Sequence, residues 1–82
     1  MSIFVLLYAV NLFDLKIGEA GVIGDVLTTE IPPKLIDIGF LQGTEINCKS
    51  VAPLGDPIIY SIGNTDIAIR KKLAQQIPIK IL

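Results

Sequence analysis

The chain has 82 residues, of which 51% are hydrophobic, and its seven basic and eight acidic residues give a net charge of −1. A chain of this length forms one small domain, residues 1–82, and the near-neutral charge argues against nucleic-acid binding, which uses a strongly basic face. There is no histidine and only one cysteine, Cys48, which excludes an intramolecular disulfide, a Cys/His zinc site and a Ser/His/Asp triad.

The first ten residues, MSIFVLLYAV, are almost entirely apolar. A membrane-spanning helix needs about 20 such residues. A signal peptide begins with basic residues, and this segment has none. We therefore interpret residues 1–10 as an additional strand or arm. Because an apolar edge strand invites pairing with another chain, this segment is also a candidate for homo-oligomer formation.

Isoleucine-rich runs and closely spaced turn residues favour a mainly β fold. Residues 11–15 predict one helical turn, with Asn11 as its N-cap. A strand with a bulge or bend at its glycines is expected over residues 20–27. The later strands are expected at residues 45–51, 58–62, 67–70 and 79–81, with a hairpin turn at 63–66 and a helical turn at 71–76.

The segment TTEIPPKLIDIGF, residues 28–40, contains the best helix signal. Thr28 or Thr29 is expected to cap the helix, and prolines are tolerated in its first turn. Gly39 is well placed as the left-handed residue that ends the helix, with Phe40 packing back on Leu35. A second turn follows at residues 41–44 and requires a positive φ at its glycine.

These elements predict a small SH3-like barrel of five to six strands with one or two short helices. Closing the strands into a barrel removes exposed sheet edges. Within the expected strand 45–51, Ile46 and Cys48 point to one face, whereas Glu45 and Lys49 point to the other. Cys48 is therefore expected to be a buried, inert thiol.

The segment Pro53-Leu54-Gly55-Asp56-Pro57 connects two of the expected strands. Leu54 and Gly55 suit the central positions of a type II turn, with a positive φ at Gly55. Asp56 can accept a hydrogen bond from nearby backbone, and Pro57 keeps Asp56 out of the helical region. A turn explains every residue except Leu54, a large apolar side chain at a loop tip. Either Leu54 folds back onto the core, or it contacts a partner.

No motif in the sequence indicates catalysis. The acidic residues are scattered through turns and caps, without the paired carboxylates or titrating histidine of acid–base catalysis. Neither GxGxxG nor GxxxxGK[ST] occurs, and no stretch has the aspartate spacing of a calcium loop. The densest basic run, Arg70-Lys71-Lys72, is interpreted as a solvated face. We expect no enzyme activity, no cofactor and no metal-binding residue.

Four blocks of the sequence together resemble the FeoA family. They are LKxGE at residues 15–19, LxxxGFxxGTE at 35–45, APLGDP at 52–57, and IAIR at 67–70 followed by Ala74 and Ile77. The resemblance covers residues 11–79. It implies a small cytosolic SH3-like protein that acts without catalysis on the FeoB ferrous-iron transporter, by direct contact with its cytosolic part at the inner face of the membrane. It implies no catalytic or metal-binding residues.

The leading hypothesis is therefore a protein–protein interaction module of ferrous iron transport. Its expected contact surface is the 53–57 loop, with the turn at residues 40–43 contributing. The candidate residues are Pro53, Leu54, Gly55, Asp56, Pro57, Phe40, Gln42 and Gly43. The alternative is a self-associating structural or ligand-binding SH3-like module, built through residues 1–10 and not tied to the transporter. Direct carriage of ferrous iron is a third alternative with little support in the sequence.

Overall fold

The structure, a computed structural model, describes residues 10–26 and 31–82. The expected strand or arm at residues 1–10 therefore lies outside the described residues, except for Val10. The elements in chain order are η1 (Leu12–Asp14), β1 (Ala20–Ile23), α2 (Pro33–Asp37), β2 (Glu45–Val51), β3 (Ile58–Ile62), β4 (Thr65–Ile69), α3 (Lys71–Ala74) and β5 (Ile79–Ile81).

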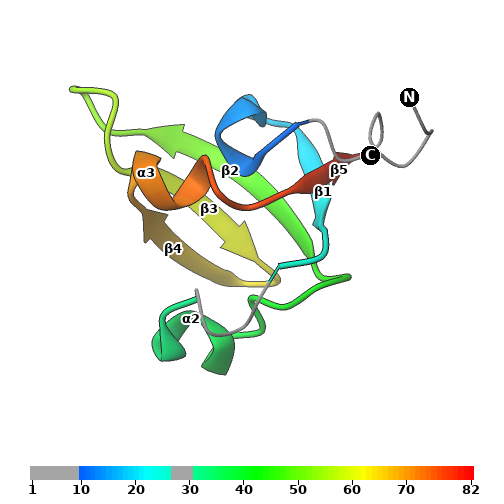
Figure 1. Ribbon diagram of the computed structural model, residues 1–82. Helices are drawn as coiled ribbons and strands as arrows, with labels where there is room; N and C mark the ends of the chain where they lie inside the picture. The colour runs from blue at the N-terminus through cyan, green and yellow to red at the C-terminus, as the bar shows by residue number, and fades with distance from the viewer. Residues whose placement is uncertain (1–9, 27–30) are drawn as a thin grey trace.

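The five strands form one antiparallel sheet in the order β4-β3-β2-β1-β5 (Figure 1). The prediction of a mainly β fold with short helices is confirmed. Within residues 10–26 and 31–82 the expected closure of the barrel does not occur, because the edge strands β4 and β5 are not hydrogen-bonded neighbours. Beside β5, the backbone N–H of Ile79 instead donates to the Val10 carbonyl at 3.2 Å, and Asn11 bridges to Pro78.

Strand β2 follows the alternation that its sequence predicts. Ile46 and Cys48 are buried, whereas Glu45 and Lys49 are exposed. The register between β2 and β3 shifts after Cys48, where the sheet has a bulge. Burial raises the pKa of the Cys48 thiol, with a smaller contribution from the nearby Glu19 carboxylate. A buried thiol with a raised pKa is a poor nucleophile, as predicted.

Helix α2 ends as predicted but begins later. Gly39 has φ +96°, and its N–H donates to the Ile36 carbonyl at 3.0 Å, while the Phe40 N–H donates to the Leu35 carbonyl at 3.0 Å. These two bonds form a Schellman motif. The expected threonine cap, however, lies outside the described residues, and the helix begins only at Pro33. A proline disfavours helical backbone at the preceding residue, and Pro32 accordingly has ψ 135°.

Strand β1 ends at Ile23, four residues before the end of the predicted strand. Its glycine, Gly21, allows close packing against β5, since a Cβ there would lie 3.2 Å from both Ile79 Cδ1 and the Lys80 carbonyl oxygen. After Ile23 the chain leaves the sheet, and the Gly24 N–H donates to the Pro78 carbonyl at 2.7 Å.

The core is a cluster of apolar side chains from every strand and from the connecting segments. Its largest fully buried members are Tyr60, Phe40, Leu12, Ile23, Ile46, Ile69, Ile77 and Ile79. The Tyr60 hydroxyl is satisfied inside this core because it donates to the Leu12 carbonyl at 3.1 Å. This bond joins β3 to η1 and fixes η1 over the sheet.

Candidate partner-binding loop

The loop between β2 and β3 is closed by backbone hydrogen bonds. The Ala52 N–H donates to the Pro57 carbonyl at 3.0 Å, and the Gly55 N–H donates to the Ala52 carbonyl at 2.8 Å. Pro53 and Leu54 therefore occupy the centre of the turn, one residue earlier than predicted. The fixed φ of proline suits the second position of a β-turn, which explains the shift. Gly55 has the expected positive φ, +86°.

Leu54 lies at the tip of this loop with 96% of its surface exposed. It does not fold back onto the core. The structure therefore excludes the first of the two alternatives that the sequence left open for this residue. Figure 1 shows the loop extending beyond the sheet at the upper left.

Asp56 connects the base of the loop to α3. Its Oδ1 accepts the backbone N–H of Lys71 at 2.9 Å, and its Oδ2 lies 3.9 Å from Nη1 of Arg70. The sequence predicted a backbone hydrogen bond to Asp56 from nearby in the chain. The donor is instead 15 residues away, so the bond links two elements rather than closing a local turn.

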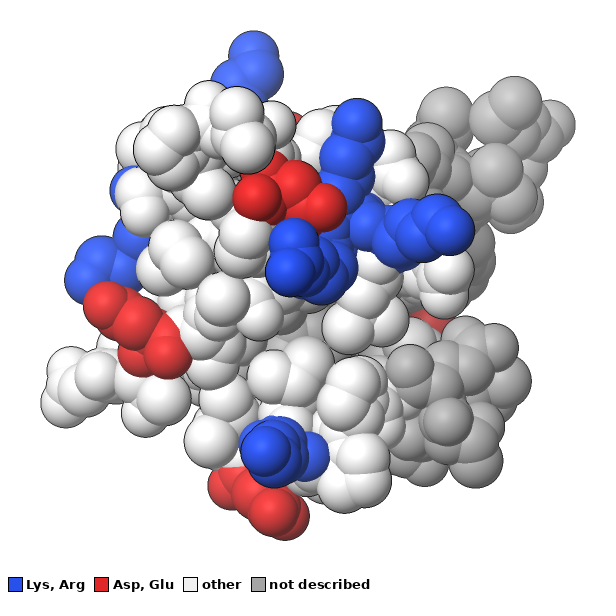
Figure 2. Space-filling model, turned by 90° about the vertical axis from the view of Figure 1, so that its left-hand side faces the viewer, with Lys and Arg blue, Asp and Glu red and all other residues white. Residues whose placement is uncertain are grey.

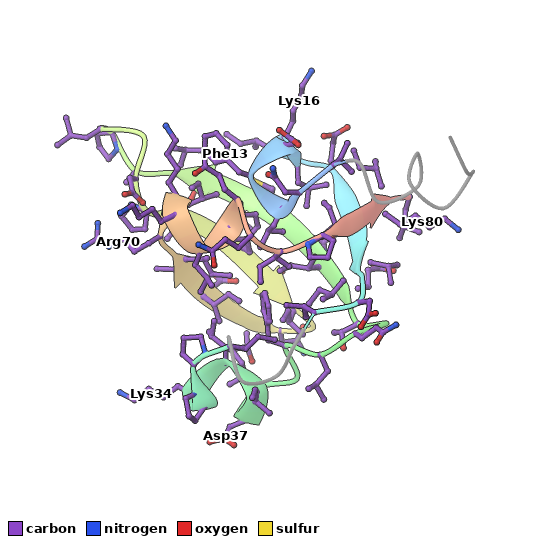
Figure 3. All side chains as sticks on the ribbon, viewed as in Figure 1. Phe13, Lys16, Lys34, Asp37, Arg70 and Lys80 are labelled. Atoms are coloured by element: carbon purple, nitrogen blue, oxygen red, sulfur yellow. The ribbon has the colours of Figure 1, made fainter. Side chains whose placement is uncertain are left out.

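Helix α3 in turn contacts η1. The ammonium group of Lys71 lies 5.1 Å from the centre of the Phe13 ring, within the range of a cation–π interaction. Phe13 is 36% exposed, and Figure 3 shows it above α3, on the side of the molecule that also carries the loop. We call this surface the loop corner and define it as residues 53–57, Phe13 and residues 70–72.

The structure does not bring the turn at residues 40–43 to the loop corner. Phe40 has no exposed surface and belongs to the core, so its side chain is not part of any contact surface. Gln42 and Gly43 are exposed but precede β2, whereas the loop follows it. A seven-residue strand is roughly 20 Å long. The two turns therefore lie at opposite ends of β2 (Figure 1).

Arg70, Lys71 and Lys72 were missed by the sequence reasoning, which assigned them to a solvated face. They are exposed, as expected, but the bond from Lys71 to Asp56 places them beside the loop. Figure 2, which faces this end of the molecule, shows basic side chains gathered around an acidic one. No local pattern in the sequence indicates that these segments meet.

Residues 10–26 and 31–82 show neither a cluster of metal ligands, nor a pocket, nor a helix suited to span a membrane. In this part of the chain there is no group of three or more histidine, cysteine, aspartate or glutamate side chains arranged to hold a metal ion. The same residues enclose no pocket. None of their helices has the length and apolar character needed to cross a membrane.

Comparison with known proteins identifies relatives over nearly the whole described chain. Residues 10–81 match the profile of the FeoA domain. The iron(II) transport protein A of Clostridium thermocellum is 36% identical, with a TM-score of 0.75 over 89% of this chain. This chain spans 46% of the length of that protein. A FeoA-like protein of Clostridium acetobutylicum is 32% identical, with a TM-score of 0.73 over 89% of this chain and 86% of the other.

A more distant solved structure identifies the type of fold. The FeoA of Stenotrophomonas maltophilia, solved in complex with zinc and described as an SH3 domain protein, is 22% identical. Its TM-score is 0.67 over 87% of this chain and 89% of its own. The SH3-like fold expected from the sequence is thus confirmed, although the sheet remains open. The chain belongs to the FeoA family.

Proposed function

We propose that this protein is a non-enzymatic accessory protein of ferrous iron transport that binds the cytosolic part of a FeoB-type transporter through the loop corner. The observation that carries the proposal is Leu54, an apolar side chain held almost fully in solvent at a loop tip. Burying such a side chain in a partner contributes about 1.5–3 kcal/mol to binding. The fold itself gains nothing from a leucine in this position.

The loop is held in shape before it meets a partner. Two backbone hydrogen bonds close it, and Asp56 ties its base to α3. Order of this kind lowers the conformational entropy lost on binding. Leu54 is therefore presented as a preorganised contact rather than as part of a flexible segment.

The residue chemistry supports contact rather than catalysis. The sequence has no histidine, and its only thiol, Cys48, is buried with a raised pKa. At the loop corner, the Asp56 carboxylate is engaged by the Lys71 N–H. The proposal places the protein in the cytoplasm, at the inner face of the membrane when it is bound to the transporter.

Affinity capture tests the proposal directly. Tagged wild type, Leu54→Arg and the control Leu82→Arg are incubated with solubilised membranes of the native organism, and the FeoB-type transporter is detected by mass spectrometry. Leu82 is a matched control because it is 67% exposed and lies outside the loop corner. We expect wild type and Leu82→Arg to recover the transporter, whereas Leu54→Arg does not.

The circular dichroism spectrum and melting temperature of Leu54→Arg should match those of wild type, because so exposed a side chain contributes little to folding. Leu54→Ser provides a second variant without a new charge. Equal recovery of the transporter by all variants would place the contact elsewhere on the surface. No recovery by folded wild type would refute the proposed partner.

Self-association is a second candidate function, favoured by the open sheet edge at β5. At this edge the Val10 carbonyl accepts the N–H of Ile79. Sedimentation of the full chain beside a variant that starts at Val10 tests this candidate. Concentration-dependent association that disappears on truncation would support it without excluding the transporter, and a monomeric full chain would contradict it.

A further inference from the structure

We infer that the surface recognised by the loop corner is an apolar pocket bordered by carboxylates. This inference rests on the proposed function, because it describes the binding site on the same partner. Leu54 would fill the pocket, while Arg70, Lys71 and Lys72 would face the carboxylates around it.

Charge is divided unevenly between the loop corner and the rest of the chain. The corner contains three basic residues and one acidic residue, Asp56, and thus has a net charge of +2. The rest of the chain contains four basic and seven acidic residues and thus has a net charge of −3. A positive corner on an otherwise negative molecule orients it toward a negative partner surface and disfavours contact through its other faces.

The contacts at the corner hold the basic segment against the base of the loop that carries Leu54. Asp56, two residues after Leu54, accepts the N–H of Lys71 and lies near Arg70, so the start of α3 lies against the loop. The Arg70 side chain remains 74% exposed despite this contact. Asp14, the neighbour of Phe13, directs a carboxylate oxygen to the Asn11 N–H at 3.0 Å. Its carboxylate is therefore already engaged within η1.

Among the basic residues of the loop corner, Lys72 provides the clearest test. It is exposed, and neither ion pair found among the described residues involves it. Lys71, by contrast, contacts Phe13. Replacing Lys72 thus changes the charge of the corner without removing a contact seen in the fold.

An anionic bilayer also combines negative charge with an apolar interior, but it fits this corner less well. Polybasic segments that bind anionic lipids carry about four to eight basic residues, and stable anchoring requires more apolar surface than one leucine supplies. Three basic groups beside a loop with a single projecting side chain fit a compact pocket better than an extended membrane surface. We therefore assign the corner to a protein surface.

The experiment measures binding to the purified cytosolic domain of the FeoB-type transporter by isothermal titration calorimetry. Wild type, Leu54→Arg, Lys72→Glu and the control Lys80→Glu are compared at about 50 mM and about 500 mM salt, because salt screens exposed charges. Lys80 undergoes the same change of charge, and Figure 3 places it on the side of the molecule opposite Arg70. The same proteins are also tested for cosedimentation with vesicles of phosphatidylcholine and phosphatidylglycerol.

We expect Lys72→Glu to weaken binding to the domain about tenfold at low salt and about twofold at high salt, whereas Lys80→Glu remains within about twofold of wild type at both. If Leu54→Arg abolishes binding while the two lysine variants behave alike, the acidic pocket is refuted and the proposed function stands. If wild type does not bind the domain, both fail. Binding to the vesicles alone, lost in Lys72→Glu, would identify an anionic membrane instead.

Discussion

Replacing Asp56 by alanine removes the link between the candidate loop and α3. The carboxylate makes two interactions, a hydrogen bond of 2.9 Å from the Lys71 N–H and an approach of 3.9 Å to Arg70. The approach to Arg70 contributes less than about 0.5 kcal/mol, because the two side chains are 74% and 39% exposed. The hydrogen bond caps the first turn of α3, and loss of such a cap costs about 1 kcal/mol.

Asp56→Ala should therefore lower the free energy of unfolding by about 1 kcal/mol and the melting temperature by about 4–8 °C. Asp56→Asn is the matched control because it keeps an oxygen acceptor in the same place without the charge. We expect this variant to lie within about 0.5 kcal/mol of wild type. Urea unfolding followed by circular dichroism measures both differences.

Amide hydrogen exchange identifies the bond itself. The Lys71 amide should exchange about fivefold faster in Asp56→Ala than in wild type, and near the wild-type rate in Asp56→Asn. If the two variants were equally destabilised, the charge opposite Arg70 would matter rather than the hydrogen bond. A fully stable alanine variant with unchanged exchange at Lys71 would show that the loop is not held through Asp56.

Three further predictions concern the fold. Tyr60→Phe should cost about 1 kcal/mol at neutral pH, because the buried hydroxyl loses its bond to Leu12. Burial raises the pKa of Tyr60 above its usual value near 10. As the pH rises, the unfolded state therefore releases the Tyr60 proton before the folded state does. In urea titrations, the free energy of unfolding of wild type should fall above about pH 10 more steeply than that of the variant. Parallel pH profiles would contradict this prediction. Gly39→Ala should lower the free energy of unfolding by about 1–2 kcal/mol, because φ at this position is +96°. Steric contact is not the cause, since the nearest side-chain atom would lie 3.9 Å from the new Cβ. An unchanged melting temperature would argue against backbone strain. Lys49→Ala should change stability by less than about 0.5 kcal/mol, since its ion pair with Asp66 is about half exposed, and a loss above about 1 kcal/mol would refute this estimate.

The sequence alone predicted those features that depend on neighbouring residues. The alternation of Ile46 and Cys48 with polar residues correctly placed β2 and its buried face. Gly39 correctly marked the end of α2, because only a residue that tolerates positive φ completes a Schellman motif without strain. The start of α2 was placed too early, because the restriction that Pro33 imposes on Pro32 keeps Pro32 out of the helix.

The candidate site shows the limit of such reasoning. Its loop was correctly located from the prolines, Gly55 and Asp56, yet the turn was placed one residue too late. The sequence left open whether Leu54 is buried, and it treated the turn at residues 40–43 as a neighbour of the loop. In the structure, Leu54 is exposed and β2 separates the two turns.

Tertiary structure decided these points because they depend on strand pairing and on contacts between distant segments. Whether Leu54 is buried depends on what packs above the loop, and whether Asp56 has a partner depends on where α3 begins in space. The bond to Lys71 spans 15 residues, and no rule of local periodicity or turn chemistry extends so far. Local preferences therefore determined the elements and the loop, while packing of the sheet determined which side chains meet at the loop corner.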